Sequence, residues 1–168
     1  MPRKYVIKTD LSVTGLSKAI KELESYKKQL HEKIYEYIHL LTETGAKIAK
    51  FEIVSFNARE TGALIDSIET AYMYIEGNKS KLQGVIFTNS HYATFVEFGT
   101  GLVGKQHPHP SQSWVYDVNN HGEQGWWYVH PESRAWVNTT GEPSKPFMHN
   151  TAQELEHVAK QLIRQVWR

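Results

Sequence analysis

The fold is decided by residues 16–48, LSKAIKELESYKKQLHEKIYEYIHLLTETGAKI. Apolar side chains recur in this stretch at alternating steps of three and four: Leu16, Ile20, Leu23, Leu30, Ile34, Tyr37, Leu41 and Ile48. That spacing places them on one stripe of a single long helix, which we expect to end near residues 55–57. Lys27 and Thr44 interrupt the strict heptad repeat. Packing of the stripe on a sheet of the same chain is therefore favoured over a coiled coil with a partner helix.

Shorter elements are expected on both sides of this helix. Residues 5–7 have the character of a short strand, and residues 68–75 and 82–88 alternate as the two strands of a β-hairpin joined by EGNKSK. Residues 92–98 form a short helix closed by Gly99. Pro146 opens a final helix, one face of which carries Ala152, Leu155, Ala159, Leu162 and Val166.

These elements predict an α+β fold. A long N-terminal helix and a C-terminal helix are expected to pack on a small, mainly antiparallel sheet. The 168 residues make one domain of ordinary size, residues 1–168.

Composition excludes several classes of protein. The chain has 19 Lys and Arg against 18 Asp and Glu, so it lacks the basic excess of a protein that neutralises many phosphates. It has no cysteine, which excludes disulfides, thiolate zinc sites and thiol nucleophiles. No apolar run has the length of a signal peptide core or of a membrane span, so we expect no membrane association.

Residues 102–145 differ in composition from the rest and form what we call the tryptophan-rich excursion. Four of the five tryptophans, four of the nine histidines and four of the six prolines lie there. Residues 126–129 and 134–137 flank the turn-like HPES and predict a second hairpin. Its aromatic rings either pin the excursion to the domain or form a platform for a protein or a sugar, and Asp117, Asn119 and Asn120 are the candidate sugar acceptors.

Candidate chemistry in the chain is weak. His107 and His109, with His121 or His130, could bind zinc, but no carboxylate stands at a set spacing from them. Gly99-Thr100-Gly101 could bind an anion, yet it is more typical of a turn that ends a helix. We therefore expect no enzyme, no cofactor and no metal; the alternatives are a metal-dependent hydrolase using the histidine-rich excursion and a carbohydrate- or protein-binding module.

Glu97 stands between Val96 and Phe98 in an apolar stretch. A single carboxylate without a partner is not an active site. We expect it to accept hydrogen bonds from the backbone or from an Arg, within the chain or across a subunit boundary.

Three motifs together resemble a known family. They are TGALIDSI at residues 61–68, YATFVEFGT at residues 92–100, and Pro146-Phe147-Met148 opening the last helix. Their order and spacing resemble the head–tail joining, or tail-completion, proteins of long-tailed bacteriophages and prophages, to which the lambda minor tail protein Z is related. Family members often place a proline and an alanine soon after Pro-Phe-Met, whereas here residues 149–151 precede Ala152.

The resemblance implies a structural, non-enzymatic protein of the virion neck or upper tail, present in the host cytoplasm during assembly. Such proteins form rings, here a hexamer, that complete the tail and join it to the head connector. The implied partners are portal-side connector proteins and the tail terminator or tail tube protein, and DNA passes through the ring without specific binding. On this basis we predict subunit or partner contacts at Phe95, Glu97, Phe98, Thr100, Trp126, Trp127, Trp136, Phe147 and Met148.

Overall fold

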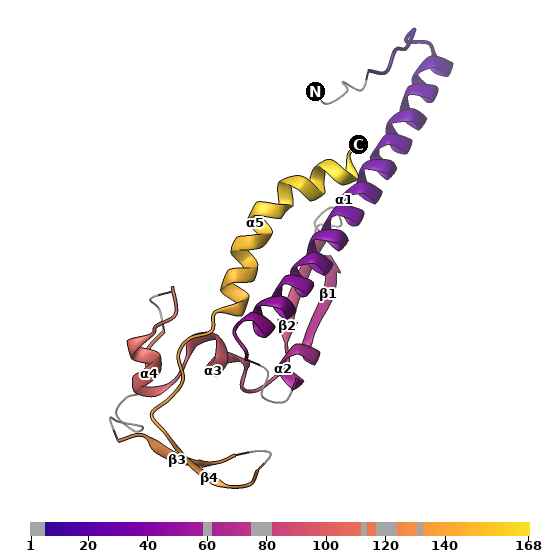
Figure 1. The fold of residues 1–168 in the computed structure, drawn as a ribbon. Coiled ribbons are helices and arrows are strands. Elements are labelled where there is room, and N and C mark those ends of the chain that lie inside the picture. The colour runs from indigo at the N-terminus through magenta and orange to yellow at the C-terminus, as the bar shows by residue number, and fades with distance from the viewer. Residues whose placement is uncertain (1–5, 59–61, 75–81, 112–113, 117–123, 131–132) are drawn as a thin grey trace.

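The computed structural model describes residues 6–58, 62–74, 82–111, 114–116, 124–130 and 133–168. The predicted α+β fold is confirmed, and its axis is one long helix, α1 (Val13–Ser55). A second helix, α5 (Phe147–Val166), and the hairpin of β1 (Ile68–Tyr74) and β2 (Leu82–Thr88) both pack along α1 (Figure 1). The short helices α2 (Ala63–Asp66), α3 (Ala93–Phe98) and α4 (Gly101–Gln106) lie beyond the C-terminal end of α1 with a second hairpin, β3 (Trp126–Val129) and β4 (Trp136–Thr139).

The boundaries of α1 follow from its capping. The Ser12 hydroxyl accepts a hydrogen bond from the Gly15 N–H at 2.9 Å, which begins the helix. The helix ends at Ser55, and Asn57 takes a left-handed conformation (φ 52°) that cannot continue it. The predicted end near residues 55–57 is confirmed. The predicted strand at residues 5–7 is wrong where the structure describes it, because Val6 and Ile7 lie in no strand.

The β1–β2 hairpin packs one face on the C-terminal half of α1. Its register pairs Ile68 with Thr88 and Tyr72 with Gly84. A side chain at Gly84 would collide with Thr42 of α1, so glycine is what permits the close approach. Gly45 acts in the same way, since a Cβ there would meet Ile86 of β2 and Leu155 of α5 together. The two strands expected from the sequence are thereby confirmed, apart from residue 75, which lies outside the described residues.

Helix α5 is attached to α1 along its whole length. Near its C-terminal end, Lys33 donates to the Val166 carbonyl at 2.6 Å, and the Tyr37 hydroxyl donates to the Ala159 carbonyl at 3.3 Å. At its beginning, Phe147 and Thr151 are buried. These two residues lie four apart, so they define the buried face of α5 at its beginning. Ala152 was predicted on the buried face but is exposed.

The hydrophobic core is small and lies at the C-terminal end of α1. It is formed by Ala46, Ala49, Ile53, Ala58, Leu64, Ile68, Ala93 and Phe147. The predicted apolar stripe of α1 packs within the chain only from Leu30 onwards; Leu16, Ile20 and Leu23 are 44%, 56% and 54% exposed. The expectation that the whole stripe packs on the same chain is therefore wrong for its N-terminal part, which extends past the end of α5 (Figure 1).

The chain exposes far more surface than a compact monomer. Its accessible surface is 12460 Å², whereas a compact protein of this mass exposes about 8,500 Å². In the part of the chain that the structure describes, no helix is long and apolar enough to cross a membrane.

Candidate functional site

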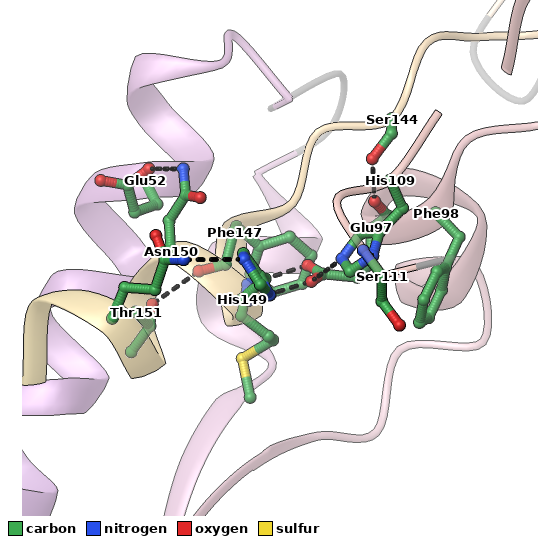
Figure 2. Close-up of polar contacts among 12 residues, drawn as sticks. Glu52, Glu97, Phe98, His109, Ser111, Ser144, Phe147, His149, Asn150 and Thr151 are labelled. Carbon is green, nitrogen blue, oxygen red and sulfur yellow. Dashed lines mark hydrogen bonds and ion pairs between the residues drawn. The ribbon is translucent and has the colours of Figure 1, made fainter. Parts of the chain in front are cut away.

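Glu97 of α3 holds the beginning of α5. Its carboxylate is buried and accepts hydrogen bonds from the backbone N–H groups of Met148 at 2.8 Å and His149 at 3.0 Å (Figure 2). The first N–H groups of a helix have no partner within it, and the helix dipole favours a negative charge there. The expectation that Glu97 accepts backbone hydrogen bonds is confirmed, and these donors belong to the same chain.

His109 completes the surroundings of Glu97. Its Nε2 lies 3.1 Å from Glu97 Oε1, and its Nδ1 accepts a hydrogen bond from the Ser111 N–H at 2.9 Å. The ring packs against Phe98 and His149, with centroid distances of 4.5 and 5.2 Å. Because both ring nitrogens are engaged within the chain, His109 is not arranged as a metal ligand.

The other histidines proposed for zinc do not gather around His109. His107 is exposed, and His130 accepts from the Ser133 N–H at 3.3 Å in the turn between β3 and β4. Among the residues that the structure describes, no three His, Asp or Glu side chains are placed to hold a metal ion. His121 lies outside the described residues.

The segment 140–145 returns along α3 and α4 and fixes the base of the excursion. Thr100 and Glu142 exchange backbone hydrogen bonds of 2.9 and 3.2 Å, and the Lys145 N–H donates to the Val96 carbonyl at 2.9 Å. Gly99, with φ 77°, ends α3 as predicted. The sequence did not predict α4, which starts at once from Gly101; its two glycines gave no helical signal.

Inner aromatic rings attach the excursion to the domain. Trp114 stacks on Phe98 at a centroid distance of 4.5 Å, and the Tyr116 hydroxyl donates to the Phe98 carbonyl at 2.9 Å. The Trp126 ring lies against Gly101, where a Cβ would be 2.8 Å from it. For these rings the interpretation as a pinning cluster is confirmed.

The outer aromatic rings form an exposed face on the second hairpin. The register pairs Trp127 with Asn138 and Val129 with Trp136, so these four side chains share one face. Trp127 is 64% exposed and Trp136 is 68% exposed. We call Trp127, Val129 and Trp136 the tryptophan face.

The second hairpin is confirmed with a shift of its second strand. β4 begins at Trp136 and not at residue 134, because Arg134 (φ 56°) belongs to the turn and donates its N–H to the His130 carbonyl at 2.9 Å. Val129 was missed as a surface residue, although its alternation with Trp127 could have indicated it.

The structure divides the predicted contact residues into three groups. Phe95, Trp127 and Trp136 are exposed; Glu97 and Phe147 are buried in the chain's own interior; half-buried positions are occupied by Phe98, Thr100, Trp126 and Met148. Only the first group offers a large free apolar surface. The candidate sugar acceptors Asp117, Asn119 and Asn120 lie outside the described residues.

One comparison with known proteins found a family that resembles this chain. Residues 17–99 match the HK97-gp10-like family model, described as "Bacteriophage HK97-gp10, putative tail-component". The matched region contains most of α1, the first hairpin and α3, with TGALIDSI at residues 61–68, and it ends before Pro146-Phe147-Met148. The comparisons with curated proteins and with solved structures returned no match. Over residues 17–99, the chain is similar to the HK97-gp10-like family, whose model describes a bacteriophage tail component.

Proposed function

We propose that this chain is a tail-completion protein that forms a ring, a hexamer matching the sixfold tail tube, between the tail and the head connector. The observation that carries the proposal is the unusual surface of the molecule. The accessible area exceeds that of a compact monomer by about 4,000 Å², and a standard interface removes about 800 Å² from each partner. In a ring, contacts with two neighbouring subunits and with partners above and below would bury that excess surface.

The tryptophan face is the proposed contact with the neighbouring virion protein, the head connector on one side or the tail terminator or tube on the other. Trp127 and Trp136 are large, rigid side chains of the kind that dominate binding energy at interfaces. Their hairpin projects from the rest of the molecule (Figure 1), while its base is held by the contacts of Thr100 with Glu142. A fixed base and an exposed tip suit a docking element.

The role we propose is structural and not catalytic. Glu97 and His109 form the one buried pair of ionisable side chains within the described residues, and their hydrogen bonds serve the beginning of α5. The near balance of 19 basic and 18 acidic residues also fits a ring through which DNA passes without being held.

Localisation in particles tests this proposal. Cryo-electron microscopy and mass spectrometry of particles from the source phage or induced prophage should show a ring of this chain at the head–tail junction, in about six copies per particle. As a control, particles carrying a tagged chain should show the added density at the same place. A position at the distal end of the tail, or absence from intact particles, would contradict the neck assignment.

A further inference from the structure

The N-terminal part of α1 extends past the helix that covers the rest of it. α5 ends beside Lys33, whose ammonium donates to the Val166 carbonyl. The N-terminal part of α1 continues beyond this point (Figure 1). Residues 13–30 extend for about 27 Å at the helical rise of about 1.5 Å per residue. Four apolar side chains of this stretch are exposed: 88% for Val13, 44% for Leu16, 56% for Ile20 and 54% for Leu23.

The exposed side chains begin a coiled-coil heptad. Counting from Val13, the exposed a positions are Val13, Ile20 and Lys27, and the exposed d positions are Leu16 and Leu23. The repeat continues into Leu30 (d) and Ile34 (a), which are half-buried within the chain. β-branched residues at a with leucine at d are the combination that favours parallel, two-stranded coiled coils. We propose that residues 13–30 of α1 pair with the same residues of a second copy of this chain in a parallel, in-register coiled coil.

The available area is sufficient for such a pair. A helix about 27 Å long and about 11 Å across has a lateral accessible surface on the order of 1,200 Å². If each copy buries about two fifths of this surface, the pair removes roughly 1,000 Å² from water, the area that a specific interface requires.

Lys27 gives the pair its register. In the in-register arrangement the two Lys27 side chains face each other in one layer, and their long chains carry the charges outward to water. A shift by one heptad would place one Lys27 against Ile20 and the other against Ile34, which is half-buried within its own chain and lies outside residues 13–30. The shifted pair would therefore have two charged layers instead of one. A single polar a position specifies register at some cost in stability.

Cysteine crosslinking of the full chain tests the pairing directly, because the natural chain has no cysteine. With Leu16→Cys, the two thiols meet across a d layer of a parallel pair, so mild oxidation should give a covalent dimer. In an antiparallel pair of the same segment the two introduced thiols would lie about 16 Å apart along the helix axis. Lys18→Cys, on the opposite face of the same helix, is the matched control and should crosslink at least tenfold less. No dimer from Leu16→Cys, or equal yields from both variants, would overturn the proposal.

Sedimentation equilibrium provides the second measurement. Leu23→Glu should raise the dissociation constant of the dimer at least tenfold, Lys27→Ile should lower it, and Ser25→Glu, on the outer face, should leave it unchanged. Far-UV circular dichroism checks that each variant is folded, which we expect because these positions lie outside the core. A wild-type chain that remains monomeric at every concentration, or a dimer that Leu23→Glu leaves intact, would contradict the pairing. These experiments test the coiled coil alone. Whether or not the chain dimerises in solution, the ring at the head–tail junction is tested separately by its presence in particles.

Discussion

At the scale of single residues, Glu97 connects segments that are far apart in the sequence. One carboxylate on α3 accepts from two backbone N–H groups of α5 and lies 3.1 Å from His109 in the loop after α4. Its side chain is 9% exposed, so water does not replace a lost partner easily. The motif that indicated the phage family therefore contains a structural residue: Glu97 orients the last helix relative to α3.

Replacing Glu97 by glutamine should destabilise the fold. The amide keeps one acceptor oxygen but turns an NH₂ group toward a buried N–H donor, so we expect the free energy of unfolding to fall by about 1–3 kcal/mol. Urea titration near pH 7 measures the loss. Glu32→Gln is the matched control: that side chain is 64% exposed and lies 3.9 Å from Lys28, a type of ion pair worth less than about 1 kcal/mol. Equal unfolding midpoints for the two variants would contradict the capping role.

Glu43 should make stability depend on pH in the acid range. The hydrogen bonds of its carboxylate, from the Tyr72 hydroxyl first and from Thr70 second, hold the pKa of Glu43 below its ordinary value of 4.5. Because the folded pKa is depressed, this stabilisation is present above the unfolded pKa and is lost as the pH falls through the folded pKa. Tyr72→Phe removes the larger cause, so its urea midpoint should fall less steeply between about pH 5 and pH 3. Tyr35→Phe, at an exposed position, should keep the wild-type slope; identical slopes for the two variants would show that the Tyr72 hydrogen bond does not control this titration.

At the scale of elements, different residues of the second hairpin serve stability and docking. Trp127→Ala with Trp136→Ala removes the tryptophan face, and because both rings are exposed we expect the free energy of unfolding to change by no more than about 0.5 kcal/mol. Incorporation of the double variant into particles, measured by mass spectrometry after complementation, should fall at least tenfold. Trp126→Ala is the contrasting variant: its ring packs on Gly101, so it should lower stability by about 2 kcal/mol. Normal incorporation of the double variant would contradict docking through this face.

The elements that the sequence predicted well are those with a clear period. The helix of residues 16–48 keeps its spacing past Lys27 and Thr44, and the strands around Tyr72 and Ile86 alternate clearly; all three elements are found. α4 was not predicted because Gly101 and Gly104 lower helix propensity. The helix is stabilised instead by residues 140–145, where the Thr140 carbonyl accepts a hydrogen bond from the Val103 N–H. The acceptor role of Glu97 was predicted, but its donors were not, since residues 97 and 148 meet only in the tertiary structure.

At the scale of the whole molecule, the buried core is concentrated at the C-terminal end of α1. The core residues Ala49, Ile53, Leu64 and Phe147 are almost completely buried where α1, α2 and α5 meet. The opposite end is a single helix whose apolar residues face water. Such a segment gains little from tertiary packing, and isolated helices of about this length are marginal in water. The molecule therefore has a stable base for assembly and an N-terminal arm that depends on a partner.

Hydrogen exchange should reveal this gradient along the one continuous helix. In the Leu23→Glu variant, which we expect to be monomeric, the amides of residues 13–30 should exchange at least a hundredfold faster than those of residues 46–53, because local opening costs little where no packing is lost. In the concentrated wild-type chain the amides of residues 13–30 should become protected as the helices pair, and Ser25→Glu should behave like the wild type. Mass spectrometry of peptic fragments measures both regions in one sample. Uniform protection along α1 in the monomeric variant would mean that the arm is stable alone, and protection that does not rise with concentration would show that no second copy covers it.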